Sequence, residues 1–190
     1  MAIVLASQSP RRQELLARIG VEDFKTLSLD IDESYPEALS PEDTVRYIAK
    51  KKCDAAAALC APDDLIITAD TMVFLGNDRL GKPRDEEDAL RMLRALAGRG
   101  HTVCTGVSVR RGAQEERFAV STRVFFRPMT DDEIRAYIKT GEPMDKAGAY
   151  GVQSRGALFV ERIDGDFFNV MGLPVEQLGL VLARFGVKLL

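Results

Sequence analysis

Residues Asp64–Asp70, with the sequence DLIITAD, decide how this chain is expected to fold. A continuous apolar run that ends in an acidic residue is typical of a strand buried within a sheet. We therefore expect a buried strand that delivers Asp70 at its carboxyl end. A carboxylate at such a place can hold a divalent cation or accept a proton from attacking water. Capping of the following turn is at least as common a role for it.

The segments around this strand alternate between helix and strand patterns, which predicts a mixed α/β fold with parallel and antiparallel pairing. The run MVFL and the turn GNDRLGKP, which follow it, suggest a hairpin. The expected helices cover residues 9–19, 40–60, 85–97, 130–141 and 174–185. The other expected strands cover residues 2–6, 24–29, 101–111, 117–127 and 157–163, and residues 164–172 are expected to form a loop.

Composition limits the class of protein. The chain has 190 residues, of which 46% are hydrophobic and 29% charged, as in a globular protein with a substantial core. The formal net charge of −3 disfavours a general nucleic-acid binder, so any anion site must be local. No apolar run approaches the roughly 18 residues of a membrane span. The start MAIVLAS is too short for a signal peptide, so we expect the mature protein to begin here.

Cysteine and histidine usage limits the chemistry. The three cysteines show no CxxC spacing, so reduced thiols in a cytoplasmic protein are expected. His101 is the only histidine, which disfavours a zinc site and a Ser/His/Asp arrangement. Any metal should therefore be a hard cation on carboxylates. The P-loop, HExxH and GxSxG motifs are absent, as is GxGxxG after the first expected strand.

The stretch Leu5–Leu16, LASQSPRRQELL, reads as a strand end, a polar turn and the first turn of a helix with Ser9 as N-cap. Arg11 and Arg12 then lie at the positive end of the helix dipole, where a cation destabilises the helix by roughly a few tenths of a kcal/mol. Backbone N–H groups, the Ser7 and Ser9 hydroxyls and the guanidinium groups together suit a phosphate. Two solvated arginines are an equally good interpretation. With phosphate as the ligand, truncation of Arg12 is expected to stabilise the empty protein slightly.

Two further groups of charges stand out. Asp30, Asp32 and Glu33 crowd one loop, which solvent or a metal would tolerate; an exposed acidic loop is the commoner case. The consecutive lysines Lys50–Lys52 point in different directions on a helix, so at most one or two can face a common cleft. Lys82 lies between glycine and proline, which fixes the local backbone, although turn lysines are usually solvated.

The segment DKAGAYGVQSRG, residues 145–156, carries three glycines that allow close approach of the backbone. Its Gln153 can present a hydrogen-bond acceptor and a donor pair, which complement the imide edge of uracil or thymine. An ordinary glycine-rich turn would look the same.

Seven motifs, taken in order, resemble the Maf family of nucleoside triphosphate pyrophosphatases, once named for septum formation. They are LASQSPRRQELL, the Glu33 loop, Lys52 in IAKKKCDA, TADTMVFL, LGKPRDEEDA, MDKAGAYGVQ and GDFFNVMGLP. The resemblance covers nearly the whole chain. It implies a single inosine-triphosphatase-like α/β domain over residues 1–190. Such a domain has a long twisted mixed sheet flanked by helices, and two lobes with a central cleft.

Within that family, the chain is similar to the branch that acts on dTTP and UTP. The resemblance implies that Asp70 is the proton acceptor, and that Glu33 and Asp70 hold a divalent cation, Mg²⁺ or Mn²⁺. Arg12, Thr71 and Gln153 would set base preference. The residues implied to contact the phosphates are Ser7, Ser9, Arg11, Arg12, Lys52 and Lys82.

The implied reaction is metal-assisted attack of water at the α-phosphorus, which gives a nucleoside monophosphate and pyrophosphate. Modified pyrimidine triphosphates are also candidate substrates, with roles in nucleotide-pool cleaning or division arrest. Two other interpretations stay open: a nucleotide-sensing regulator of septum formation without significant turnover, and a pyrophosphatase for 7-methyl-GTP or modified purines. The resemblance is compatible with a homodimer, and neither nucleic acid nor a membrane is expected as a partner.

Two positions depart from the family pattern. Thr68 precedes the AD pair where glycine is common, and Ser154 follows Gln153 where glycine is common. Both flank the candidate site, and both are expected to alter loop geometry or rate without removing a functional group.

Overall fold

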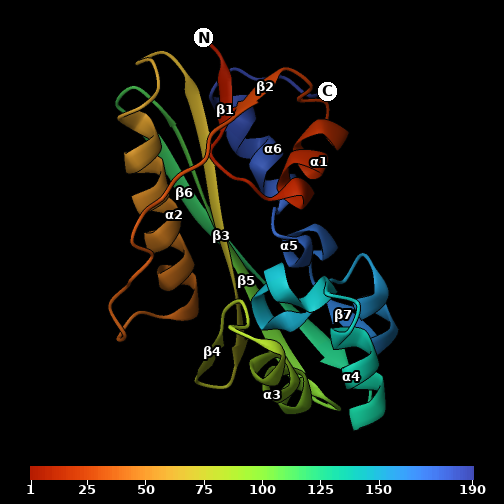
Figure 1. Ribbon diagram of the computed structural model, residues 1–190. Coiled ribbons are helices and arrows are strands. Elements are labelled where there is room, and N and C mark those ends of the chain that lie inside the picture. The colour runs from red at the N-terminus through yellow and green to blue at the C-terminus, as the bar shows by residue number, and fades with distance from the viewer. The chain divides into compact units, whose positions relative to one another are not determined.

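The computed structural model describes residues 1–190 and confirms a mixed α/β fold (Figure 1). The strands are β1 (Ile3–Leu5), β2 (Phe24–Thr26), β3 (Leu65–Leu75), β4 (Asp78–Leu80), β5 (Gly100–Arg111), β6 (Gln114–Phe126) and β7 (Val160–Asp164). They form one sheet in the order β2-β1-β3-β5-β6-β7, with β4 paired to β3. β1 runs parallel to β2 and β3, whereas the β3–β4 and β6–β7 pairs are antiparallel. The predicted mixture of pairing is confirmed.

Each of the five predicted helices begins one residue after its predicted first residue. The helices are α1 (Pro10–Arg18), α2 (Pro41–Ala57), α3 (Glu86–Leu96), α4 (Asp131–Ile138), α5 (Phe167–Met171) and α6 (Val175–Arg184), with three 3-10 helices η1 (Glu142–Asp145), η2 (Ala147–Ala149) and η3 (Arg155–Phe159). Ser40 caps α2 by accepting a hydrogen bond from the Asp43 backbone N–H. Thr130 and Glu133 form a complete capping box at the start of α4.

The chain divides into two compact units. Unit 1 consists of residues 1–70, 105–120 and 172–190, and unit 2 of residues 71–104 and 121–171. Strands β3, β5 and β6 contribute residues to both. Helices α1, α2 and α6 belong to unit 1, and α3, α4, α5 and the 3-10 helices belong to unit 2. The single domain over residues 1–190 stays a prediction.

In unit 1, α2 lies on one side of the strands, and α1 and α6 lie on the other (Figure 1). Ala6, Cys53, Ala56 and Ile66 form a buried cluster between α2 and the sheet. Gly106 of β5 brings the two layers into backbone contact, because a Cβ added there would lie 2.3 Å from the Val45 carbonyl carbon. That distance is too short for any side chain.

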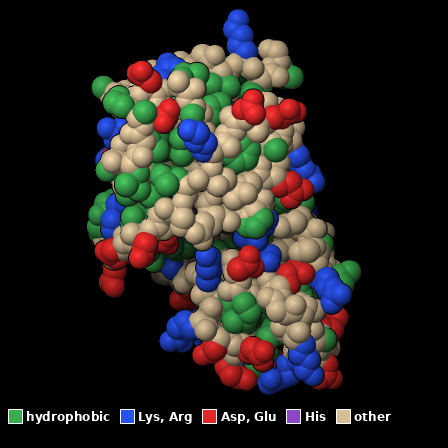
Figure 2. All heavy atoms as spheres, turned by 45° about the horizontal axis from the view of Figure 1, so that its top comes forward, with side chains coloured by type: hydrophobic (Ala, Val, Ile, Leu, Met, Phe, Trp, Pro, Cys, Tyr) green, Lys and Arg blue, Asp and Glu red, His purple; other side chains and the backbone are tan.

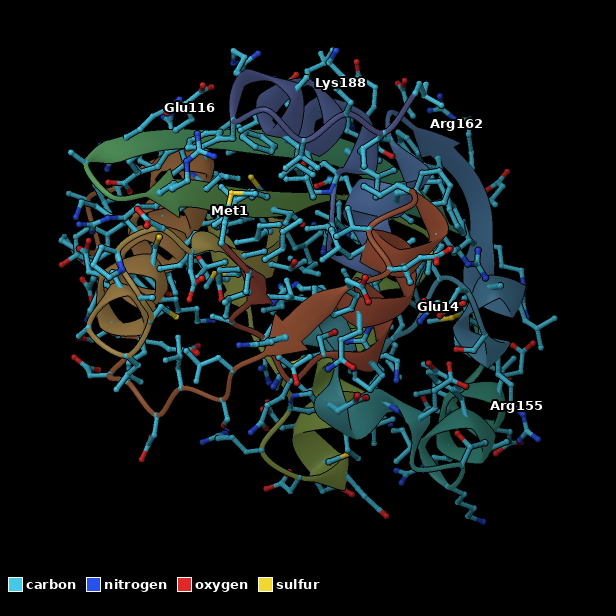
Figure 3. All side chains as sticks on the ribbon, turned by 90° about the horizontal axis from the view of Figure 1, so that it is seen from above. Met1, Glu14, Glu116, Arg155, Arg162 and Lys188 are labelled. Atoms are coloured by element: carbon cyan, nitrogen blue, oxygen red, sulfur yellow. The ribbon has the colours of Figure 1, made fainter.

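On the other side of unit 1, an ion pair joins α6 to the sheet. Glu116 of β6 lies beside α6 in the view from above (Figure 3). Its carboxylate accepts two hydrogen bonds of 2.9 Å from the Arg184 Nε. Both side chains are partly exposed, so we expect this pair to contribute little to stability.

The core of unit 2 contains an aromatic cluster around the only histidine. His101 is 2% exposed, and its Nε2 lies 2.8 Å from the Tyr150 hydroxyl. The imidazole meets the Phe126 ring edge-on at a centroid distance of 4.9 Å, and Phe126 contacts Tyr150 and Phe159 in turn. Burial lowers the pKa of His101 to about 4. A catalytic role for this histidine, disfavoured by the sequence, has no support in this setting.

One strand extends beyond its predicted end. The strand was expected to stop at Asp70, yet β3 continues to Leu75. The backbone stays extended because β3 changes partner along one edge: β1 pairs with it as far as Ile67, and β4 pairs with it from Val73. The predicted hairpin is confirmed as β3–β4.

Two predictions near the C-terminus are wrong in part. Residues 157–159, expected to be strand, belong to η3, since the Ala157 N–H donates to the Ser154 carbonyl and closes a tight turn. The expected loop 164–172 contains α5. The Asp166 carboxylate accepts from the Phe168 N–H at 2.8 Å and satisfies a donor at the start of that short helix.

The surface and the cysteines agree with the composition. Acidic and basic side chains are interspersed over the face shown in Figure 2. None of the helices combines the length and the apolar character that crossing a membrane requires. None of the three cysteines forms a disulfide, and Cys53 and Cys104 are buried.

Replacement of Gly106 by alanine should destabilise the protein. The added methyl group collides with the α2 backbone, which cannot move without displacing the whole helix, so the free energy of unfolding should fall by at least about 2 kcal/mol. Urea denaturation measures this. Gly81→Ala is the matched control, because a Cβ there meets nothing within 4 Å. Equal stability of the two variants would contradict the close approach of α2 and β5.

The buried imidazole should make stability depend on pH. The folded pKa of His101 is about 4 and its ordinary value is 6.5, so between these values the unfolded chain binds a proton that the folded protein does not. The free energy of unfolding should therefore fall as the pH is lowered from 7 to 4, with His101 contributing up to about 3 kcal/mol. Nuclear magnetic resonance of untagged protein can follow this single histidine. A folded-state titration midpoint near 6.5 would contradict its burial.

Candidate active site

Asp70 lies in the middle of β3, where one edge of the strand changes partner. Between the β1 ladder, which ends at Ile67, and the β4 ladder, which begins at Val73, residues 68–72 have no strand partner on that edge. Within this stretch, the Ala69 carbonyl accepts a hydrogen bond from a side chain of another element, that of Arg12. The sequence predicted Asp70 at a strand end, and the structure places it at this break in pairing.

Lys52 of α2 joins the two predicted metal-binding carboxylates. Its Nζ lies 2.8 Å from Asp70 Oδ1 and 2.9 Å from Glu33 Oε1. The side chains of Lys52 and Asp70 are only 13% and 11% exposed, whereas that of Glu33 is 56% exposed. The acidic loop, the long helix and the central strand thus converge on one ammonium group. We infer that the pairing fixes the orientation of the Asp70 carboxylate.

The three consecutive lysines have three different partners. Lys50 pairs with Asp54 one turn along α2. Lys51 donates to the Ser34 carbonyl at 3.1 Å, and only Lys52 reaches Asp70. The prediction that at most one or two of them face a common site is confirmed.

Thr68, one of the two departures from the family pattern, holds α2 against β3. The side chain is fully buried, and its hydroxyl donates a 2.7 Å hydrogen bond to the Ala49 carbonyl. Ala49 lies three residues before Lys52, slightly less than one helical turn, so this bond fixes the helix close to the Lys52–Asp70 pair. Any effect of Thr68 on rate stays a prediction.

Arg12 donates to backbone carbonyl groups around the same break in β3. Its Nη1 lies 2.9 Å from the Ala69 oxygen, and its Nε lies 2.8 Å from the Gly172 oxygen. Burial lowers the pKa of the guanidinium, and the nearby Asp70 carboxylate opposes this effect. These carbonyl groups partly balance the charge of the guanidinium. Arg12 therefore holds α1, β3 and the segment before α6 together.

The start of α1 has no side-chain cap. Ser9 occupies the predicted N-cap position, but its hydroxyl makes no capping hydrogen bond, and the first turn contains no acidic residue. The Ser7 hydroxyl accepts from the Ser9 N–H at 3.2 Å and from Arg12 Nη1 at 3.4 Å. A helix start with this lack of negative charge is suited to an anion.

In unit 2, the segments that carry Lys82 and Gln153 are linked through the backbone. Both side chains are exposed. The Gly148 N–H donates a 3.0 Å hydrogen bond to the Gly81 carbonyl, next to Lys82. Gly148 has a φ of +69°, and a Cβ there would lie 2.8 Å from Val73 Cγ2, so this position requires glycine. The predicted close approach of the glycine-rich segment is confirmed at Gly148.

The structure thus groups the predicted site residues within each unit. Unit 1 contains Ser7, Ser9, Arg11, Arg12, Glu33, Lys52 and Asp70, and unit 2 contains Thr71, Lys82 and Gln153. Contacts in unit 1 join Lys52 to Glu33 and Asp70, and Ser7 to Arg12. Thr71 directly follows Asp70 in β3.

The sequence analysis did not single out Glu142, whose carboxylate accepts three hydrogen bonds from the segment that carries Gln153 and one from Tyr137 of α4. The nearest sequence signal is its place between Gly141 and Pro143, which marks a turn but does not indicate which groups the acid would contact.

The residues present suit a divalent cation that shares its ligands with a phosphate. No group of three or more His, Cys, Asp or Glu side chains is placed to hold a metal. Glu33 and Asp70 supply two carboxylates close to one another, since both contact Lys52 Nζ. Mg²⁺ is commonly bound by one or two carboxylates with substrate phosphates and water as the remaining ligands. This donor set fits such a cation.

Comparisons of the sequence with known proteins agree with the motifs. A family model described as "Maf-like protein" matches residues 2–185. A relative from Bacillus velezensis, named "dTTP/UTP pyrophosphatase", is 46% identical over 186 residues, which cover 98% of this chain and 97% of the relative. A relative of the same name from Dictyoglomus turgidum is 47% identical over 191 residues, which cover 99% of this chain and 98% of the relative.

Solved structures with low sequence identity share the fold. A HAM1 protein from Coxiella burnetii superposes with a TM-score of 0.56 at 15% identity, over 97% of this chain and 99% of that protein. The Staphylococcus aureus Ham1 protein gives a TM-score of 0.53 at 14% identity, over 97% of this chain and 100% of that protein. The likeness confirms the expected inosine-triphosphatase-like fold class.

Truncation of Arg12 should destabilise the empty protein, in contrast to the expectation from the helix dipole alone. Arg12→Ala removes two charge-assisted hydrogen bonds to carbonyl groups, which stabilise the fold by about 1–3 kcal/mol. Removal of the positive charge from the helix start stabilises it by only roughly a few tenths of a kcal/mol. Urea denaturation without nucleotide should show the loss. Arg18→Ala, which breaks an exposed pair with Glu14 on the same helix, is the control and should change stability by less than about 0.5 kcal/mol. An Arg12→Ala protein more stable than wild type would contradict the structural role.

Proposed function

Because the chain belongs to the Maf family, we propose that it hydrolyses dTTP and UTP to the nucleoside monophosphate and pyrophosphate. The observation that carries the proposal is the placement of the Asp70 and Glu33 carboxylates around the Lys52 ammonium group at the break in β3. The names of relatives that are 46% and 47% identical over nearly their whole length support the substrate class.

In the proposed reaction, a water molecule attacks the α-phosphorus and pyrophosphate leaves. The Asp70 carboxylate accepts the proton of that water. Lys52 donates to one oxygen of Asp70 and leaves the other available to the water. The low exposure of the Asp70 side chain limits competition from bulk solvent, which strengthens each electrostatic contact there.

Charge neutralisation is the second requirement, because a triphosphate repels an attacking oxygen. Lys52 and Arg12 together balance Glu33 and Asp70, so this group by itself is neutral and further positive charge is needed. On the family resemblance, we assign part of it to Lys82 and Arg11. A divalent cation held by Glu33 and Asp70 would neutralise phosphate oxygens and acidify water when bound. The Ser7 and Ser9 hydroxyls donate to phosphate oxygens at the uncapped start of α1.

Base selection is assigned to Gln153, Thr71 and Arg12. The exposed amide of Gln153 is free to donate one hydrogen bond to uracil or thymine and to accept another. Cytosine presents part of the opposite pattern, and an amide can rotate to suit it. Discrimination therefore requires that the Gln153 amide be held in one orientation.

We place this enzyme in the cytoplasm, in keeping with its three free cysteines. A homodimer is proposed on the family resemblance alone. Which pyrimidine triphosphate is physiological, normal or modified, decides between general nucleotide metabolism and removal of damaged nucleotides.

The decisive experiment is a nucleotide panel with purified wild-type protein. Pyrophosphate release is measured from dTTP, UTP, CTP, GTP and 7-methyl-GTP, each with Mg²⁺, with Mn²⁺ and with a chelator. The proposal expects the highest kcat/KM for dTTP and UTP, and loss of turnover when the metal is removed. Preference for 7-methyl-GTP would favour the purine interpretation. Tight binding without pyrophosphate release would favour a nucleotide sensor.

Asp70→Asn should separate catalysis from binding. The amide has the same shape but is a poor proton acceptor, so kcat for UTP should fall by about 10²–10⁴-fold. Affinity for a non-hydrolysable UTP analogue, measured by calorimetry, should change by less than about tenfold, since the other phosphate contacts remain.

Asp63→Asn is the matched control, because this exposed carboxylate just before β3 lies outside the site. The control should turn over UTP at the wild-type rate. Near-wild-type turnover by Asp70→Asn would remove Asp70 from the mechanism.

A further inference from the structure

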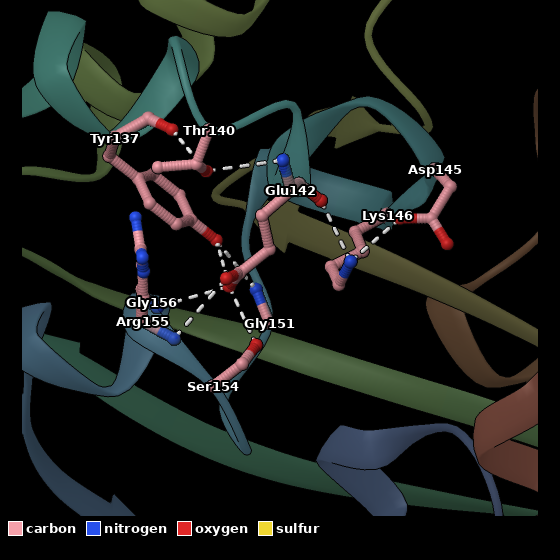
Figure 4. Close-up of polar contacts among 9 residues, drawn as sticks. All are labelled: Tyr137, Thr140, Glu142, Asp145, Lys146, Gly151, Ser154, Arg155 and Gly156. Carbon is pink, nitrogen blue, oxygen red and sulfur yellow. Dashed lines mark hydrogen bonds and ion pairs between the residues drawn. The ribbon is translucent and has the colours of Figure 1, made fainter.

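The Glu142 carboxylate is the centre of a hydrogen-bond network in unit 2 (Figure 4). Its Oε1 accepts from the Tyr137 hydroxyl at 2.7 Å, the Ser154 hydroxyl at 2.6 Å and the Gly156 N–H at 3.2 Å. Its Oε2 accepts from the Arg155 N–H at 3.3 Å. One side chain at the start of η1 thus binds three successive residues, 154–156, that follow Gln153.

Tyr137 of α4 extends the network to the other side of Gln153. Its hydroxyl donates to Glu142 and accepts from the Gly151 N–H at 3.1 Å. Burial raises the pKa of Tyr137, so the hydroxyl stays protonated and remains a donor. Gly151, before the turn at 152–153, is therefore linked to the Glu142 carboxylate through Tyr137, and residues 154–156, after the turn, bind that carboxylate directly.

Hydrogen-bond donors, and not a cation, balance the charge of Glu142. Burial alone would raise the pKa of this carboxyl group, but hydrogen bonds from Ser154, Tyr137 and the backbone outweigh it and lower the pKa. Lys146 does not pair with the carboxylate: its Nζ donates to the Glu142 backbone carbonyl and to Asp145. The ionised side chain thus acts as an acceptor for Tyr137 and for the turn, and not as the partner of a cation.

The turn is also closed by steric contact. A Cβ on Gly156 would lie 2.6 Å from the Gly151 carbonyl oxygen, and a Cβ on Gly151 would lie 2.7 Å from Lys146 Cε. The two glycines therefore bring the ends of the turn together. Gln153 lies between these ends with its side chain exposed. A turn fastened in this way presents one exposed amide on a fixed backbone.

Ser154 has a specific place in this arrangement. Glycine, common at this position in the family pattern, would lack the hydroxyl that donates to Glu142. The departure therefore adds one side-chain hydrogen bond directly beside Gln153. Glycine would also leave the backbone next to Gln153 freer to move.

From this geometry we propose that Glu142 is a positioning residue for Gln153. The hydrogen bonds that Glu142 accepts from Tyr137 and from residues 154–156 form what we call the clamp, and the Ser154 hydroxyl strengthens it in this chain. The clamp fixes the backbone of the turn so that the Gln153 amide meets the base edge in one orientation. Discrimination between uracil and cytosine then depends on Glu142, although Glu142 itself does not touch the nucleotide. This inference rests on the proposed function, because it assigns base reading to Gln153.

The test compares Glu142→Gln, Ser154→Ala and Gln153→Ala with wild type, using UTP and CTP as substrates. Glu142→Gln should raise KM for UTP roughly tenfold, with a much smaller change in kcat, and should reduce the preference for UTP over CTP. Ser154→Ala should act in the same direction with a smaller effect, and Ser154→Thr, which keeps the hydroxyl, should restore the preference. Glu161→Gln, an exposed acid on β7, is the control.

A double-mutant cycle distinguishes positioning from general destabilisation. If Glu142 acts through Gln153, adding Glu142→Gln to Gln153→Ala should change KM for UTP by less than about twofold. Additive effects, or equal losses for UTP and CTP, would overturn the proposal. If Glu142→Gln fails to fold, the exposed Ser154 carries the same test through Ser154→Ala combined with Gln153→Ala.

Affinities for UTP and CTP, measured by calorimetry with chelated metal, separate this inference from the proposed function. If wild type releases no pyrophosphate but binds UTP more tightly than CTP, and Glu142→Gln removes that preference, the pyrophosphatase proposal fails and the clamp stands. If wild type turns over UTP and Glu142→Gln behaves like Glu161→Gln, the clamp fails and the function stands. Absence of any preference for UTP in binding and in turnover would overturn the clamp.

Discussion

The ammonium of Lys52, placed between the carboxylates of Glu33 and Asp70, is the interaction on which the site in unit 1 depends. Without it, two negative charges would stand close together with one of them largely removed from water, an arrangement that costs several kcal/mol. The fold supports this ammonium from several sides. α2 packs on the sheet through Gly106, and the Thr68 hydroxyl fastens the helix to β3 near Lys52. The geometry of the site therefore depends on the packing of α2 on the sheet.

The change of partner along β3 explains why the site lies where it does. A strand paired along both edges offers no carbonyl group to an outside donor. Between the β1 and β4 ladders of β3, the Ala69 carbonyl accepts a hydrogen bond from the Arg12 side chain instead of from a strand. The guanidinium is consequently both a structural tie and a charge near Asp70. This dual use accounts for a cation at a helix start, where the dipole alone would disfavour it.

Local patterns predicted most elements, because caps and periodicity are properties of short segments. Ser40, Thr130 and Glu133 marked the starts of α2 and α4, and the structure confirms them. The same patterns could not show that β3 continues past Asp70, since that depends on which strands lie beside it. The carbonyl partner of Arg12 at Gly172 lies 160 residues away in sequence. The roles of Glu142 and Ser154 likewise depend on a hydrogen bond between residues 12 apart in sequence, which the residue types alone do not predict.

The position of the only histidine has a consequence for how activity varies with acidity. Imidazole is the side chain that ordinarily gains or loses a proton near neutrality. Here that group is enclosed by Phe126 and Tyr150 and remains uncharged until the medium is strongly acidic. A change in turnover between pH 6 and pH 8 must then originate outside imidazole chemistry, for example in the terminal phosphate of the nucleotide. For this enzyme, a profile measured across neutrality would therefore report on the substrate and on water acidified by a bound cation, and not on the histidine.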